Sequence, residues 1–506
     1  MKRFIYLLLL LPFGVCAQNM YNIAPLLGED IAGTARFMAM GGSMGALGGD
    51  VSVMGVNPAG TALYRSSDFA FTAGTNFNNT RSRFGAIEVE SDFTDVSLKN
   101  FGMVWANRLD EPNLTFLNFG INYRRKNHLS NNFDMYGYSD GFSQQYVIED
   151  IYKRDPFDID KLNYRMYDNF QYSWLALLAA ETFGVDKDGN FLAYEDGTLA
   201  FPVTDMGYYS EERGGIDVVD INLSANINDV LYIGATIGFH NVDYSRYSYY
   251  YEGNAYNKEI YSLVNNYTVQ GNGIDFKLGA IVRPFKYSSF RMGFAVHTPT
   301  YYYDLMDMTS ASILGPDGCV YDTRDYDLFN DDLRVEYKLR TPWRWNASVA
   351  YTFANCFALN AEYEYSDYTQ TSFPQRSGIS KSQTSEIDYN MKAQEIFRFG
   401  AEFFYEGISL RAGYNYQTAP FKTSAYKCLD AAGITETSTE YMNKFEKETV
   451  TLGGGYRGEV FYFDVAYMLQ SQKADFFPYY DVEYENPAAK VKFLNQTISA
   501  TVGMRF

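Results

Sequence analysis

The sequence is poor in the residues that build disulfide frameworks and most metal sites. Its 506 residues include only four cysteines and three histidines. Cys16 lies in the N-terminal apolar segment, so an odd number of cysteines remains for the rest of the chain, which argues against a disulfide framework. Cys319 and Cys428 fall in expected outer loops, and the sequence leaves open whether they form a disulfide.

Long apolar runs are also missing. No segment reaches the roughly 18 to 20 consecutive apolar residues that a transmembrane helix needs. Yet aromatic residues make up 18% of the chain, with 46 Tyr and 39 Phe, and the mean hydropathy is −0.28. This combination is typical of a transmembrane β-barrel, whose apolar surface is spread over alternate residues.

Positive charge is scarce as well. The chain has 42 Lys and Arg against 61 Asp and Glu, a net charge of −19. This disfavours nucleic-acid binding, which needs a basic footprint. No HExxH motif occurs, and no histidines stand at metal-pair spacing. We therefore expect no enzyme, no metal and no cofactor. The acidic loops form either a solvated surface or, through divalent cations, contacts to lipopolysaccharide.

The N-terminus has the pattern of an export signal. Lys2 and Arg3 precede the apolar run Phe4–Phe13, and Val15-Cys16-Ala17 resembles a small-residue cleavage site. We predict a signal peptide over 1–17 and a bacterial outer-membrane location.

From Ser67 onward the sequence alternates between apolar and polar residues, which is the pattern of strands. In 408–417, for example, Ile408 and Leu410 share one face with Tyr414, whereas Ser409 and Arg411 share the other. We predict an all-β, porin-like antiparallel barrel of about fourteen strands over 66–506.

Short connections alternate with long ones in the expected barrel. The short ones are expected at 107–113, 226–230, 284–289, 354–357, 406–407 and 457–459. The long ones are expected at 78–93, 127–214, 251–266, 304–331, 370–392, 422–445 and 474–492. Short turns belong on the periplasmic side, which also places both termini there.

The long extracellular insertion at 127–214 contains an apolar, helix-favouring segment, 172–183. It is either a helix that caps the barrel mouth or a landing surface for an apolar ligand. The candidate landing residues are Trp174, Leu175, Leu177 and Leu178.

The segment 33–68 is rich in Gly, Ala and Met and follows neither a helix nor a strand period. Within it, the run Met38–Gly42, then Ala46–Asp50, then Asn57-Pro58-Ala59-Gly60 resembles the hatch of the FadL family of outer-membrane transporters for hydrophobic compounds, the group that includes TodX. The resemblance continues in Thr341-Pro342-Trp343 and in 410–414 and 452–457.

The resemblance implies that residues 18–65, called the hatch below, plug the barrel lumen. It also implies that a bend in the third strand opens a lateral hole through which an apolar ligand leaves sideways. The third strand is expected near 114–126, with Asn118, Gly120 and Asn122 on its inward face. Glycine in a strand marks a bulge or a close backbone approach, so Gly120 is either the bend of this lateral gate or an ordinary barrel glycine.

Pro58 restricts Asn57 to an extended conformation, and the Asn57 side chain is suited to a turn that seats the hatch. Five apolar hatch side chains would face either the barrel wall or a ligand, because Met adapts to irregular apolar shapes. These candidate pocket residues are Phe37, Met38, Met40, Met44 and Met54.

The resulting hypothesis is passive, hatch-gated uptake of long-chain fatty acids or other hydrophobic molecules such as hydrocarbons. One alternative is a barrel that acts as a scaffold for outer-membrane protein partners. A weaker alternative is haem uptake.

Overall fold

The computed structural model describes 20–506 with gaps. The gaps are 110, 140–142, 155, 158–172, 186–189, 192–202, 255–258, 316–317, 327–331, 355, 376–377, 380–386, 428–434 and 481–487. The expected signal peptide and Cys428 lie outside the described residues.

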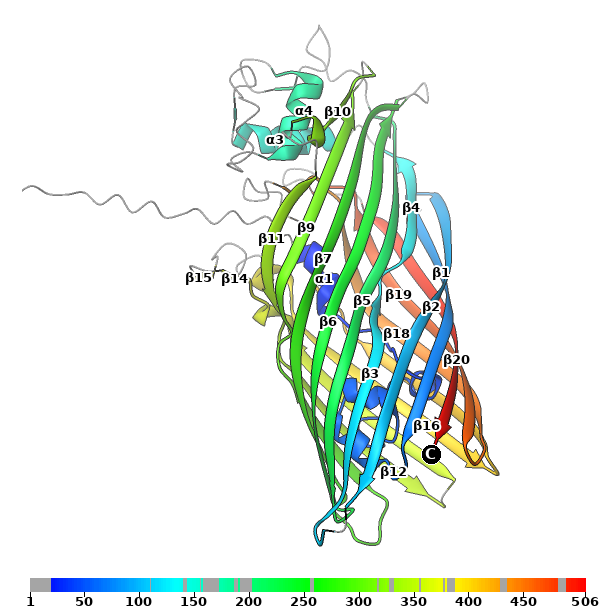
Figure 1. Ribbon diagram of the computed structural model, residues 1–506. Coiled ribbons are helices and arrows are strands. Elements are labelled where there is room, and N and C mark those ends of the chain that lie inside the picture. Colours follow the sequence, from blue (N-terminus) through cyan, green and yellow to red (C-terminus); the bar gives the residue numbers. More distant parts are fainter. Residues whose placement is uncertain are drawn as a thin grey trace, which may run out of the picture.

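The chain forms a closed antiparallel barrel in which the last strand pairs with the first (Figure 1). Three barrel strands are each broken into two pieces, and counting each as one confirms fourteen strands. The strands are β1 (Asp68–Phe84), β2 (Ile87–Arg108), β3 with β4 (Leu114–His128, Asn131–Tyr138), β5 (Asp205–Ile227), β6 (Leu231–Gly253), β7 (Glu259–Val282), β8 with β9 (Arg291–His297, Tyr301–Leu314), β11 with β12 (Leu333–Arg340, Arg344–Phe353), β13 (Phe357–Asp367), β16 (Ala393–Tyr405), β17 (Ile408–Gln417), β18 (Tyr441–Arg457), β19 (Phe461–Phe477) and β20 (Ala489–Arg505).

Small elements lie in the connections between the barrel strands. They are β10 (Val320–Asp322), which pairs with β9, the two-stranded β14 (Pro374–Gln375) and β15 (Gly378–Ile379), η5 (Thr323–Tyr326) and η6 (Tyr368–Gln370).

The expected alternation along the strands is confirmed. On β18 and β19, Leu452 and Phe463 point outward with 55% and 48% of their surface exposed. Their neighbours Thr451 and Asp464 point inward and are buried. The barrel therefore has an apolar outer face and a polar inner face, as a barrel in a lipid bilayer needs.

All six expected short connections are present between the strands. The expected long loops at 78–93 and 251–266 are wrong. Strand β1 continues to Phe84 and turns directly into β2 at Ile87, and β6 and β7 take up most of 251–266. The insertion is also shorter than expected and lies at 139–204, since β4 and β5 take up both of its ends. The reason is that strands such as β7, with 24 residues, extend beyond the roughly 9 to 11 residues that span a bilayer.

The hatch residues fold inside the barrel (Figure 1). They form α1 (Met20–Leu27), α2 (Ala35–Ala39), η1 (Val51–Gly55) and η2 (Pro58–Leu63). The segment from α2 to η2 lies near the end with short turns, and α1 lies nearer the outer end. The first described residues thus stand in the outer half of the lumen.

Helices α3 (Gln144–Arg154) and α4 (Trp174–Phe183) form a cap at the outer end. The landing-surface interpretation is wrong for α4, because all four candidate side chains are buried, from Leu175 at 0% exposed to Leu177 at 4%. They pack in one apolar cluster with Phe476 and Phe493 of the barrel strands. Among the described residues, no helix has the length and apolar character needed to cross a membrane.

Because the outer face is apolar, a charged side chain placed on it should destabilise the barrel in lipid. Leu452→Arg should destabilise the barrel in lipid vesicles by about 2–4 kcal/mol, the range for a cation near the bilayer midplane. The control is Glu446→Arg, on the same outward face of β18 but farther toward the outer loops, which should change stability little. Denaturant unfolding in vesicles measures both, and equal effects would contradict the placement of β18 in the bilayer.

Candidate functional site

The Asn57-Pro58-Ala59-Gly60 motif seats the hatch on the barrel wall. Asn57 is the N-cap of η2, and its Oδ1 accepts a hydrogen bond from the Ala59 N–H at 3.1 Å. Its Nδ2 donates to Gly45 O within the hatch at 2.8 Å and to Ala280 O of β7 at 3.4 Å. Pro58 begins η2, where its missing N–H is not needed. The fully buried Asn57 thus joins two hatch turns to the wall.

The hatch backbone touches the wall where the strands carry glycine. A Cβ at Gly400 would lie 2.7 Å from Met40 O, and one at Gly279 would collide with Asn57 Oδ1. We call these wall residues the glycine belt, and they are Gly102, Gly120, Gly234, Gly279, Gly293, Gly400, Gly413 and Gly453. Glycine is needed here for close approach, because any larger side chain would push the hatch away from the wall.

The structure places the three candidate gate residues under the hatch rather than at a bend. Gly120 lies in an unbroken part of β3, paired with Val104 on one side and Asn222 on the other. A Cβ at Gly120 would collide with Met54 of the hatch. Asn118 donates to Thr61 O and Tyr64 O, both at 2.9 Å, and Asn122 Oδ1 accepts from Asn100 Nδ2 at 2.7 Å. The expected bend at Gly120 is therefore wrong, and this glycine belongs to the belt.

The five candidate pocket residues are buried in contacts between hatch and wall. Phe37, Met38, Met40 and Met44 share one cluster with small side chains of the wall, and Met54 belongs to a second. Of the five, Met38 alone lines the central cavity described below. The set therefore packs the hatch rather than forming one ligand pocket.

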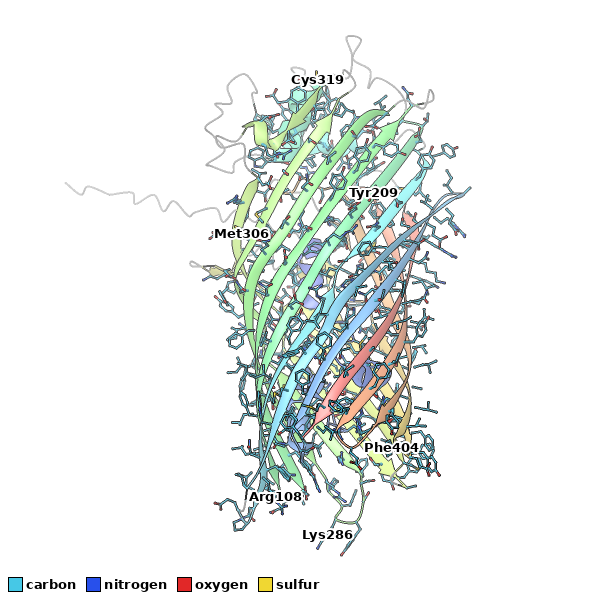
Figure 2. All side chains as sticks on the ribbon, turned by 45° about the vertical axis from the view of Figure 1, so that its right-hand side comes forward. Arg108, Tyr209, Lys286, Met306, Cys319 and Phe404 are labelled. Carbon is cyan, nitrogen blue, oxygen red and sulfur yellow. The ribbon has the colours of Figure 1, made fainter. Side chains whose placement is uncertain are left out.

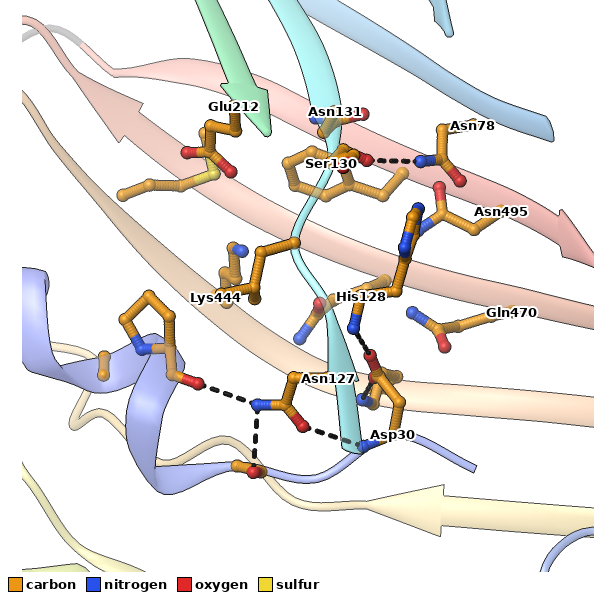
Figure 3. Close-up of a pocket in the computed structure, with 18 of the residues that line it drawn as sticks. Asp30, Asn78, Asn127, His128, Ser130, Asn131, Glu212, Lys444, Gln470 and Asn495 are labelled. Atoms are coloured by element: carbon orange, nitrogen blue, oxygen red, sulfur yellow. Dashed lines mark hydrogen bonds and ion pairs between the residues drawn. The ribbon is translucent and has the colours of Figure 1, made fainter. Parts of the chain in front are cut away.

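The third barrel strand does break, but farther along, between β3 and β4 at Leu129 and Ser130 (Figure 3). Among the described residues, β2 pairs with β3 from Asn100 to Arg108 and not above. Beyond that point β3 turns to the hatch instead, as Asp30 N donates to Lys126 O and His128 N donates to Asp30 Oδ2, both at 3.1 Å. Asp30 thus replaces β2 as the partner of this strand.

The upper part of β2 and the segment β4 are joined by side chains instead of a backbone ladder. Asp95 of β2 lies 3.1 Å from His128 Nε2, and Ser91 donates to Asp134 of β4 at 2.5 Å. Arg213 of β5 lies 4.1 Å from the centre of the Phe93 ring. We call this stretch of wall, between β2 at 87–99 and the β3–β4 break, the lateral gap.

A cavity of about 320 Å³ lies directly behind the lateral gap. Residues on both sides of the gap line it, including Asn76, Lys99 and His128. Figure 3 labels His128 together with Asn78 and Ser130. Its volume lies at the lower end of the roughly 300–1,000 Å³ of small-molecule pockets. Its walls combine amides and cations with aromatic rings, namely Asn127, Lys447 and Gln470 with Phe133, Phe421 and Phe493. We call it the central cavity.

Two acidic residues tie the hatch to the wall beside this cavity. Glu29 bridges Arg124 of β3 and Arg344 of β12, and Asp30 pairs with Lys447 of β18 at 3.1 Å. Burial alone raises the pKa of Glu29, but the guanidiniums of Arg124 and Arg344 outweigh it and hold this pKa well below its usual range. Glu29 therefore stays ionised at neutral pH.

Sequence reasoning missed Glu29, Asp30 and Asn127. Asn127 at the strand break donates to Pro25 O at 2.8 Å and Gly28 O at 3.0 Å, so it also holds the hatch. The available signal was the adjacent acidic pair in a mostly apolar hatch, since a buried charge needs a partner.

The three histidines have local partners: His128 lies against Asp95, His240 Nε2 lies 3.0 Å from Asp275, and His297 Nε2 lies 2.8 Å from Val56 O. Within the described part of the chain, no group of three His, Cys, Asp or Glu side chains is placed to hold a metal ion.

Comparison with known proteins identifies the fold. No family model matches the chain, and no curated protein does. Among solved structures, a FadL homologue of Pseudomonas aeruginosa is 12% identical, with a TM-score of 0.54 over 94% of this chain and 99% of its own. A deltaS2 mutant of the TodX monoaromatic hydrocarbon channel is also 12% identical, with a TM-score of 0.53 over 94% of this chain and 100% of its own. The resemblance inferred from the sequence is thus confirmed for the fold.

Loss of the Asn57 side chain should loosen the hatch without unfolding the barrel. Asn57→Ala leaves the buried Gly45 O and the Ala59 N–H without partners, a cost of about 1–3 kcal/mol each at most. Hydrogen exchange of 45–63 should accelerate while that of β17 and β18 stays unchanged. Asn107→Ala, at an exposed position of β2, is the matched control. Equal protection in both variants would show that Asn57 does not seat the hatch.

The ionised Glu29 predicts a pH dependence of hatch mobility. Its pKa is lowered in the folded state, so its stabilisation is present above the unfolded value of about 4.3 and is lost as pH falls toward the folded value. A nitroxide at Gly28→Cys, where a Cβ meets no atom within 4 Å, reports this region. Cys319, Cys356 and Cys428 are replaced by Ser in all variants. The label should gain mobility below about pH 4.

Glu29→Gln is the control for that experiment. It should make the label mobile already at pH 7 and flatten the response to acid, because glutamine cannot pair with the two guanidiniums. The same acid transition in Glu29→Gln would assign the pH dependence to another group.

Proposed function

We propose that the protein is an outer-membrane channel that takes up long-chain fatty acids or related hydrophobic molecules and releases them sideways through the lateral gap. The observation that carries this proposal is the break between β3 and β4. Beside the central cavity, β2 remains paired with β1 but has no backbone partner on its other edge among the described residues. The solved barrels with this fold include a FadL homologue and a monoaromatic hydrocarbon channel, in keeping with a hydrophobic ligand.

Lateral release suits the physics of such a ligand. An alkyl chain gains about 0.8 kcal/mol for each CH₂ group that it buries, so release into water below the barrel is unfavourable, whereas release into lipid is not. The hatch and its close contacts with the glycine belt obstruct the direct path downward. The lateral gap offers the alternative path, since side-chain contacts can separate without breaking a strand ladder.

The lining of the central cavity favours an amphipathic ligand over a pure hydrocarbon. Lys447 and Asn127 stand on the polar side, and rings such as Phe133 and Phe493 form the apolar side. A carboxylate among the amide and ammonium donors, with its chain along the rings, satisfies both surfaces.

The hatch gates this route through Asp30. Because the edge of β3 that leaves β2 is bonded to Asp30, a movement of the hatch changes the same strand that borders the gap. The hatch and the gap are therefore parts of one mechanism.

Locking the lateral gap should stop uptake. Ser91 and Asp134 are in side-chain contact across the gap, so Ser91→Cys with Asp134→Cys should form a disulfide between β2 and β4. In a background with Cys319, Cys356 and Cys428 replaced by Ser, cells should take up labelled palmitate poorly when the pair is oxidised. Uptake should recover after reduction.

The Ser91→Cys single variant is the matched control, and its uptake should not respond to oxidant. Full uptake by the locked barrel would contradict lateral release. If the locked barrel kept full uptake and native purification returned a stoichiometric protein partner, the scaffold function would be favoured instead.

A further inference from the structure

A second cavity, of about 420 Å³, lies below the hatch at the barrel end with short turns. Six arginines line it, against two carboxylates, Glu402 and Asp229. We call it the arginine cup, and the six are Arg36, Arg65, Arg283, Arg291, Arg457 and Arg505. This excess of positive charge contrasts with the net charge of −19 for the whole chain.

Distant parts of the sequence converge in the cup. Arg36 comes from α2 of the hatch, Arg291 begins β8, and Arg457 and Arg505 end β18 and β20. Phe404, which also lines the cup, lies toward the lower end of the barrel in Figure 2, the end where Arg108 and Lys286 are also labelled. The fold therefore brings these arginines together, and no local sequence motif indicates this.

Three of the arginines already have a carboxylate partner. Arg36 pairs with Glu402 at 2.8 Å, Arg65 with Asp229 at 3.1 Å and Arg505 with Asp68 at 2.9 Å. Glu402 is shared, because Arg411 Nε also donates to it at 2.7 Å.

The other three arginines have no carboxylate partner within the described part of the chain. Arg283 donates to Ser288 O at 2.8 Å, and Arg457 lies over the Tyr462 ring at 5.4 Å. Arg291 donates through Nη1 to Leu47 O at 2.9 Å, and its buried Nε has no hydrogen-bond partner. A buried, unpaired donor on a charged group is costly unless a ligand satisfies it.

We propose that the arginine cup is a binding site for an oxyanion, a phosphate or carboxylate group held by Arg283, Arg291 and Arg457. The planar guanidinium fork matches two oxygens of such an anion, and Arg is the preferred residue for this geometry. The anion is either free in solution or the headgroup of a phospholipid at the rim. This site stands apart from uptake through the lateral gap, so the failure of either proposal leaves the other intact.

Anion binding in the cup also affects the hatch. Arg291 holds Leu47 O, and Arg36 Nη1 donates to Gly49 O at 2.7 Å, so two cup arginines grip the same hatch turn. An anion that fixes these guanidiniums stabilises the turn at 47–49.

Titration of the full-length barrel in zwitterionic detergent with pyrophosphate tests the site. Calorimetry should show saturable binding that weakens with added salt. Arg283→Gln with Arg457→Gln should weaken binding by about tenfold or more, the effect of losing one or more charge-assisted hydrogen bonds. Arg108→Gln, an exposed arginine at the same barrel end outside the cup, should bind like the parent protein.

A second arm separates the two sources of the anion. Native mass spectrometry of barrels from nanodiscs of phosphatidylglycerol or phosphatidylcholine should show retained phosphatidylglycerol if the headgroup is the ligand, and loss of it in the double variant. Pyrophosphate binding without lipid retention assigns the site to a soluble anion. Neither binding nor retention, or equal binding by the double variant and the parent protein, would overturn the proposal.

Discussion

The close approach of the hatch backbone to the glycine belt is the constraint on which the rest of the structure depends. Because the wall has no side chains at these positions, the hatch backbone lies directly against the strands. The contacts then place Asn57 beside β7 and Met54 against β3. A hatch held at this distance closes the lower lumen, leaves the central cavity above it and forms the roof of the arginine cup.

The break in the third strand follows from the same seating. Once the hatch lies in the lumen, Asp30 forms hydrogen bonds with the backbone of β3 at Lys126 and His128. These bonds replace the backbone hydrogen bonds that β2 would otherwise form with β3 there. Buried backbone N–H and C=O groups are nearly always hydrogen-bonded. A strand can therefore separate from the neighbouring strand where another group supplies those hydrogen bonds. The lateral gap is therefore a product of hatch and wall together, which explains why no residue of the third strand marks it.

Sequence reasoning succeeded where the signal is local. Alternation placed Leu410 outside and Arg411 inside, and turn residues located all six short connections. The Asn57-Pro58 pair was expected to form a turn that seats the hatch, and it does. It failed where the outcome depends on a distant partner. For Gly120 the sequence left both a bend and an ordinary barrel glycine open, because Met54, which fills the space beside it, is far away in the sequence. For Leu175 and Leu178 the sequence left both a cap and a landing surface open, because their partners on β19 and β20 could not be foreseen.

The sequence by itself determined the barrel, its strand number and its apolar outer face, because these depend on periodicity and turn chemistry within short windows. The presence of a plug was implied by the resemblance of the hatch motif to the FadL family. Only the tertiary structure decided where the wall opens and where charge collects. Asp30 and His128, or Arg36 and Arg457, are far apart along the chain, and no spacing rule relates them. Their meeting is set by the seating of the hatch against the glycine belt, a contact whose geometry exists only after the barrel has closed.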